Sequence, residues 1–160
     1  MTEGEMKSIV LLLSVARMSE KALEFAVGQA KASGAELTVL YVIDTNLADE
    51  VFDKFTDIGF MGDKPSTQLT EAIMKEFRQR GYEDLGRVQV KAMEEGVAYN
   101  PMTVQGDFFR CAMEEIERRK ADIVVAVKRK ESVLARYFYK SPVDELKKSA
   151  SCEVVIFEEE

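Results

Sequence analysis

The 160-residue sequence contains no histidine, only two cysteines and only three prolines. The absence of histidine excludes Ser-His-Asp triads, Cys-His dyads and zinc sites with histidine ligands. Cys111 and Cys152 are too few for a disulfide scaffold or a four-cysteine metal site, and they favour a reducing compartment. We therefore expect no catalytic residue of these classes and no bound metal.

Long hydrophobic runs are also missing. The apolar run at residues 9–13 is far shorter than the roughly 20 residues that a membrane span needs, and residues 1–7 lack the basic start of a signal peptide. The chain has 29 acidic and 22 basic residues, for a net charge of -7, and such a surface repels a phosphate backbone. We expect a cytoplasmic protein with neither membrane nor nucleic-acid partners.

Hydrophobic periodicity predicts an α/β fold in one doubly wound domain over residues 1–160, with flexible tails at 1–6 and 158–160. Continuous or alternating apolar segments predict strands at 9–13, 36–44, 97–104, 121–127 and 153–157. Helices are predicted from Ser19, an N-cap, to Gly34, a stop, and then over 66–95, from Asp107 onward, and over 142–150. Pro101 places the third strand at a sheet edge. These elements give a five-stranded, mostly parallel sheet with helices on both faces.

The connection at residues 45–65 carries apolar side chains of its own between Val51 and Met61. One interpretation is a loop that folds on its own small core. The other is a lid over the cleft or a surface for a protein partner, because long ordered loops are often functional.

Four segments follow one another in a characteristic order: the first strand followed by residues 19–23, the segment 35–44, Gly106-Asp107 with residues 121–125, and the segment 141–157. Together they resemble the universal stress protein family over almost the whole chain. The resemblance implies the strand order 3-2-1-4-5. It also implies a homodimer that pairs through the last strand, whose apolar edge residues are Val154, Val155, Ile156 and Phe157.

The nucleotide-binding branch of that family has a signature after the fourth strand: Gly, two residues, Gly, nine residues, Gly, then Ser or Thr. Its three glycine positions fall on Val127, Lys130 and Lys140, and only the final hydroxyl, Ser141, is present. The same branch has an aspartate after the first strand, and Ser14 occupies the matching position here. Because glycines let backbone N–H groups approach a phosphate, their loss predicts that ATP is not bound in the family manner.

A basic stretch nevertheless occupies the same region. Lys128, Arg129, Lys130, Arg136 and Lys140 are accompanied by a single acid, Glu131. Together with the helix that begins after Ser141, this stretch can hold a phosphate, a nucleotide in a new pose or an acidic partner. The alternative is a solvated loop whose lysines face the acidic surface.

Three functional hypotheses remain open. The first is a binding or signalling module of the universal stress protein kind, with no established catalysis and no cofactor. The second is an ATP or AMP binder, or weak ATPase, that uses Lys128, Lys130 and Lys140 for the phosphates. The third is a pure interaction protein that acts through its dimer edge and the Val51–Met61 segment. Any ligand site is expected at the strand-order reversal, with the candidate residues Ser14, Val42, Val127, Lys128, Lys130, Lys140 and Ser141.

Overall fold

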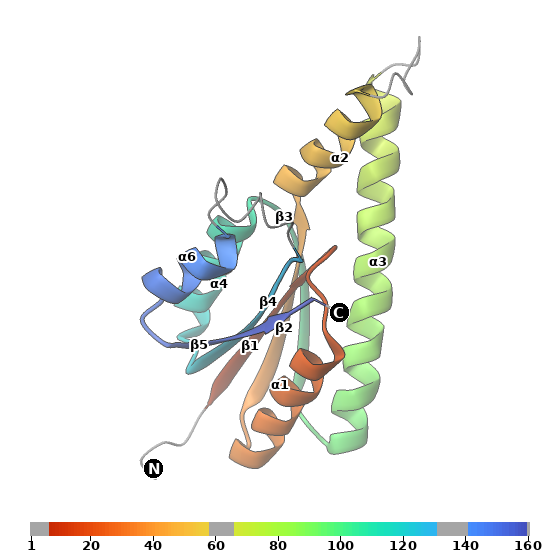
Figure 1. Cartoon of the computed structure of the whole chain (residues 1–160). Helices are drawn as coiled ribbons and strands as arrows, with labels where there is room; N and C mark the ends of the chain where they lie inside the picture. Colours follow the sequence, from red (N-terminus) through yellow and green to blue (C-terminus); the bar gives the residue numbers. More distant parts are fainter. Residues whose placement is uncertain (1–6, 58–65, 131–140, 160) are drawn as a thin grey trace.

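The computed structural model describes residues 7–57, 66–130 and 141–159. Figure 1 shows the elements in chain order. They are β1 (Ser8–Ser14), α1 (Glu20–Ser33), β2 (Glu36–Asp44), α2 (Thr45–Asp57), α3 (Ser66–Glu95), β3 (Tyr99–Gly106), α4 (Phe108–Arg119), β4 (Ile123–Lys128), α6 (Pro142–Ser149) and β5 (Glu153–Glu158).

The five strands form one parallel sheet in the order β3-β2-β1-β4-β5, so the predicted fold class and strand order are confirmed. The central strands are covered on both faces, which explains why their sequences are almost continuously apolar. Residues 9–13 of β1 are fully buried. The order reverses between β1 and β4, and this reversal is where doubly wound sheets hold their ligands.

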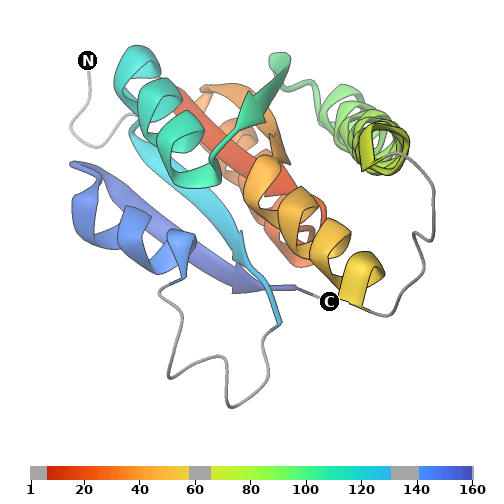
Figure 2. The same cartoon turned by 90° about the horizontal axis from the view of Figure 1, so that it is seen from above.

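Two helical layers cover the sheet, as the view from above shows (Figure 2). Side chains of α1, α2 and α3 pack with one set of strand residues, including Leu11, Val39 and Tyr41. Side chains of α4 and α6 pack with the alternate set, including Leu12 and Val124. The period of two along each strand therefore divides the core into two halves.

The predicted helix ends are confirmed for α1. The Ser19 side chain accepts a hydrogen bond from the Ala22 N–H at 3.3 Å, and Gly34 adopts φ 69°, a left-handed conformation that glycine tolerates. Asp107 caps α4 by accepting from the Arg110 N–H at 2.9 Å. These local signals are short-range, so the sequence alone places them well.

The segment after β2 differs from the expected loop. Residues 45–57 form helix α2, which begins directly after the strand, while Ile58, Phe60 and Met61 lie outside the described residues. Leu47 and Ala48 of α2 belong to the same buried cluster as Ile73 and Phe77 of α3, and the two helices are in contact, so the apolar side chains of α2 form one face of a helix. Figure 1 shows α2 and the first half of α3 extending together beyond the sheet.

Helix α3 is continuous through Gly81 and Gly86. An added Cβ at Gly81 would lie 2.8 Å from the Tyr41 ring, so glycine lets the helix approach β2 closely. The third strand lies two residues later than predicted and is at the sheet edge, as Pro101 indicated. The last strand was expected to end at residue 157 and to be followed by a tail. Instead Glu158 belongs to β5, and the Glu159 N–H donates a further hydrogen bond to the Lys128 carbonyl of β4.

In both edge strands, alternate residues direct their backbone N–H and C=O groups away from the sheet. The Leu37 N–H donates to the Ala98 carbonyl at 2.9 Å, so even-numbered residues of β3 bond to β2 and odd-numbered ones, such as Thr103, point their backbone outward. The Glu159 N–H donates to the Lys128 carbonyl at 2.9 Å, so the backbone groups of even-numbered residues of β5, such as Ile156, point outward.

Within the described ranges, no helix is long and apolar enough to cross a membrane.

Candidate functional site

The candidate ligand residues lie at the carboxyl end of the sheet. Ser14 ends β1 and is paired with Val42 of β2, while Val127 and Lys128 end β4. Ser141 is the buried N-cap residue of α6, although its side chain makes no capping hydrogen bond. Lys140 lies outside the described residues. The strand ends thus place Ser14, Val42 and Val127 at one edge, as parallel topology requires.

A tight turn between β1 and α1 shapes this edge. The backbones of Ser14 and Arg17 bond to each other in both directions, at 3.3 and 3.0 Å, and Ala16 between them has φ 66°. A left-handed conformation at a residue with a side chain costs roughly 1–2 kcal/mol. The turn brings Arg17 back over the end of its own strand.

Arg17 is almost completely buried, with 3% of its side chain exposed. Its Nη1 lies 2.7 Å from Oδ2 of Asp44 and 3.0 Å from Oγ of Ser14. Its Cζ lies 4.3 Å from the centre of the Phe108 ring, a cation–π distance. Burial lowers the pKa of Arg17 below its usual range, and the Asp44 carboxylate opposes that shift. A charged side chain of the protein therefore fills the edge beside Ser14.

Asp44 connects this arginine to α2. Its second oxygen, Oδ1, accepts from the backbone N–H groups of Asn46 at 3.0 Å and Leu47 at 3.3 Å. These are N–H groups at the start of α2, which lack partners within a helix. One buried carboxylate thus ends β2, pairs with Arg17 and fixes the position at which α2 begins.

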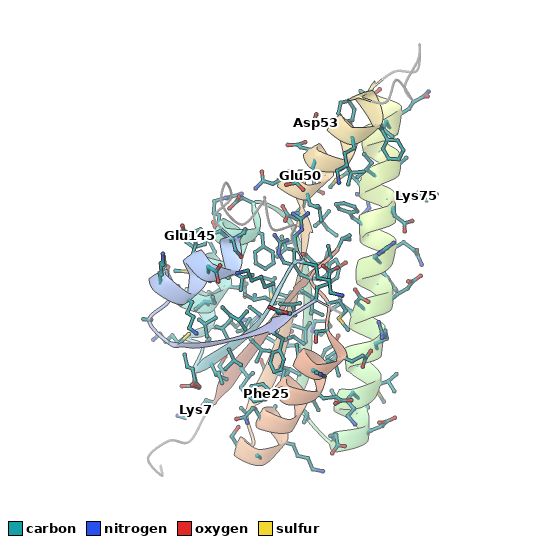
Figure 3. All side chains as sticks on the ribbon, in the orientation of Figure 1. Lys7, Phe25, Glu50, Asp53, Lys75 and Glu145 are labelled. Carbon is teal, nitrogen blue, oxygen red and sulfur yellow. The ribbon has the colours of Figure 1, made fainter. Side chains whose placement is uncertain are left out.

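The described part of the basic stretch is bonded to acidic residues of the chain itself. Lys128 Nζ lies 2.8 Å from Asp144 of α6, and Arg129 Nη2 lies 3.2 Å from Glu50 of α2. The Lys130 backbone N–H donates to the Glu159 carboxylate at 2.9 Å. Figure 3 labels Glu50 on α2. Arg136, like Lys140, lies outside the described residues.

An open cleft of about 570 Å³ remains between the β1–α1 turn and α3. Its charged lining has five carboxylates and two guanidinium groups, those of Glu20, Glu76, Glu83, Asp84 and Glu159 against Arg80 and Arg87. Such a lining disfavours an anionic ligand. Among the described residues, no group of acidic or cysteine side chains is arranged to hold a metal ion.

Sequence reasoning missed Arg17, Asp44, Glu50 and Glu159. A signal existed for Asp44, since a carboxylate directly after a buried strand lies at the same edge as the residues following β1. No comparable signal marks Glu50 or Glu159, because their contacts depend on how α2 and the end of the chain lie over that edge.

Residues 6–158 match the family model described as the universal stress protein family. The chain belongs to this family. A universal stress protein of Methanocaldococcus jannaschii is 27% identical over 154 residues, which are 96% of this chain and 83% of that protein. The resemblance that the segments of this universal stress protein indicated is thus confirmed.

Solved structures of the family share the fold. A family protein from Arabidopsis thaliana with AMP bound has a TM-score of 0.58 at 14% identity, covering 96% of this chain and 92% of that one. A universal stress protein in complex with cAMP has a TM-score of 0.58 at 16% identity, covering 97% and 99%. At these identities the likeness shows the fold alone.

Proposed function

We propose that this universal stress protein is a non-catalytic binding or signalling module that does not bind ATP in the manner implied by the glycine signature. The observation that carries the proposal is the buried Arg17–Asp44 pair with its bond to Ser14. This network joins the ends of β1 and β2 beside the strand-order reversal, and it includes Ser14, which stands where the nucleotide-binding branch has its aspartate.

Among the described residues, several groups that would hold a phosphate are engaged within the protein. Val127 stands at the first glycine position and is fully buried in the sheet. The N–H of Lys130, at the second glycine position, donates to the Glu159 carboxylate. Lys128 is held by Asp144. A nucleotide would have to displace carboxylates that already satisfy these donors, which opposes binding of another anion.

Titration of the full chain with Mg-ATP at low salt is therefore expected to give a dissociation constant of about 1 mM or weaker, equivalent to about 4 kcal/mol or less. Isothermal titration calorimetry measures it directly, and a titration of AMP into the Arabidopsis relative, whose structure holds AMP, is the positive control for the method. A micromolar constant for this chain would contradict the proposal.

A variant series separates the second hypothesis. If micromolar binding were observed and then lost in Lys128→Ala, Lys130→Ala or Lys140→Ala, the lysine side chains would be the phosphate ligands. Retention of that binding in all three variants would place the nucleotide outside the basic stretch. Both results would replace the present proposal with nucleotide binding.

We also propose that the protein is a homodimer through β5. This strand is at the sheet edge, and Val155, Ile156 and Phe157 are partly exposed beside the buried Val154. An open apolar edge is a template for pairing. The backbone of Ile156 points away from β4, so its N–H is available for a second copy.

Ile156→Pro is expected to convert the dimer to a monomer, because proline removes an outward N–H without breaking a β4–β5 bond. Light scattering at micromolar concentration measures the change, and circular dichroism checks the fold. Thr103→Pro is the matched control, since it removes an outward N–H from the opposite edge. A wild-type monomer, or a dimer that survives Ile156→Pro, would argue against β5 pairing.

A further inference from the structure

An uncharged groove of about 360 Å³ lies between the outer face of α3 and the edge strand β3. Its lining includes Tyr82, Leu85 and Gly86 from α3 and Tyr99, Pro101 and Thr103 from β3. Among the residues that the structure describes, no charged one lines it, although 32% of the chain is charged. The groove is on the opposite edge of the sheet from β5, so it is separate from the proposed dimer strand.

The backbone beside the groove is not paired on its outer side. Tyr99, Pro101, Thr103 and Gln105 direct their backbone groups away from β2, as the bond between Leu37 and Ala98 requires. Among the described residues, none forms a backbone bond to these outward groups. An edge of this kind accepts a further strand through main-chain hydrogen bonds.

Gly86 leaves space in the groove that the fold itself does not use. A Cβ added at Gly86 would meet no atom within 4 Å, whereas one at Gly81 would lie 2.8 Å from the Tyr41 ring. Packing against Tyr41 thus explains why residue 81 is a glycine, and no contact among the described residues explains why residue 86 is one. The open space at Gly86 lies in the groove itself, so it can receive a side chain of another molecule.

An exposed stripe of α3 continues along the same side. Tyr82 is 84% exposed and Met93 is 71% exposed, and the spacing 82, 86, 89, 93 places these positions on one helix face. The Tyr99 hydroxyl donates to the Leu85 carbonyl at 2.8 Å and ties α3 to β3 at the groove. Large exposed apolar side chains beside a free strand edge are typical of an interaction surface.

We propose that this groove binds an extended, uncharged segment of a partner protein, which adds to β3 as a sixth strand. Its backbone pairs with the outward groups of Tyr99 and Thr103. Its apolar side chains contact Tyr82 and enter the space over Gly86. Uncharged side chains fit because the lining has no charge to pair with a buried ion.

Pro101 favours a different chain over a second copy of this one. Its backbone nitrogen points outward and has no hydrogen to donate. A two-fold pairing of β3 with itself along the groove, from Tyr99 to Thr103, would contain Pro101 twice and lose two backbone bonds. A separate peptide meets Pro101 once and loses one. The self-pairing arrangement is therefore the weaker of the two.

Selection from a phage-displayed library of random seven-residue peptides on the full-length protein tests the proposal. We expect uncharged sequences that alternate β-branched or aromatic residues with small ones. A selected peptide, made synthetically, is expected to bind Gly86→Leu at least tenfold more weakly than wild type in fluorescence polarisation. It is also expected to slow amide hydrogen exchange at Tyr99 and Thr103, whose N–H groups point outward.

Gly28→Leu is the matched control. Gly28 is also a helical glycine with no atom within 4 Å of an added Cβ, but it lies on α1, away from the groove. The Gly28→Leu variant should bind the peptide with the same affinity as wild type. Thr103→Pro, which removes an outward N–H, provides a second variant if Gly86→Leu does not fold, and it should also bind at least tenfold more weakly.

Failure to enrich any sequence, enrichment of charged sequences, or equal binding to Gly86→Leu and wild type would overturn the proposal. Disulfide formation between two copies of Thr103→Cys in solution would overturn it as well, because a second copy would then occupy the groove.

Discussion

Replacing Arg17 by methionine is expected to lower the free energy of unfolding by about 3–5 kcal/mol, the range for removing one partner of a buried ion pair. The change leaves the Asp44 carboxylate, whose side chain is 3% exposed, without its guanidinium partner 2.7 Å away. It also removes a bond to Ser14 and the contact with the Phe108 ring. Chemical denaturation followed by circular dichroism measures the loss.

A second substitution should restore most of this stability. In Arg17→Met combined with Asp44→Asn, neither partner is charged, while the asparagine oxygen can still accept from the N–H groups at the start of α2. Replacing both members of a buried pair by neutral groups is often close to neutral. The double variant is therefore expected to unfold at a higher denaturant concentration than Arg17→Met alone.

Arg80→Met is the control for this pair. Arg80 lies 3.2 Å from Glu76 on α3, but 57% of its side chain is exposed, and exposed pairs contribute only about 0–1 kcal/mol. If Arg17→Met lost no more stability than Arg80→Met, the buried network would not organise this edge of the sheet. The main structural support for the proposal that ATP is not bound in the family manner would then be lost.

Replacing Gly81 by alanine is expected to destabilise the protein by about 1–3 kcal/mol, as overpacking of a core does. The new methyl carbon would lie 2.8 and 2.9 Å from two carbons of the Tyr41 ring, and Tyr41 is fully buried beneath α3. The same substitution at an open helical site stabilises by up to about 1 kcal/mol. Gly28→Ala, where the methyl group meets no atom within 4 Å, is the matched control and should have the opposite sign.

A double-mutant cycle identifies the ring as the cause. Tyr41→Val removes the ring atoms that the methyl group would contact, so Gly81→Ala should be less destabilising in that background than in wild type. Equal effects in the two backgrounds would mean that Gly81 matters for another reason.

Much of the fold was predictable because its signals are local. The fully apolar run of β1 predicted a strand covered on both faces, and Ser19 and Gly34 marked the ends of α1. Pro101 indicated an edge strand because proline has no N–H to donate and so is tolerated where the backbone nitrogen faces away from the sheet. The strand order itself came from the resemblance to a family, since periodicity does not choose which strands become neighbours.

The candidate site was predictable only in outline. Its position followed from topology, because the carboxyl ends of parallel strands meet at one edge. The missing glycines at Val127 and Lys130 were visible in the sequence, but their consequence was not. That consequence depends on Glu159, which lies 29 residues from Lys130 in the chain and reaches its N–H only because β5 lies beside β4.

The sequence by itself determined the α/β class, the helix caps, the edge position of β3 and the loss of the glycine signature, since each depends on residue type and short spacing. The tertiary structure decided that residues 45–57 form a helix, that Arg17 pairs with Asp44 across 27 residues, and that Gly81 is tightly packed while Gly86 is open. Two glycines five positions apart have the same backbone preferences. What distinguishes them is the side chain that the fold places opposite each one, and only three-dimensional packing sets that.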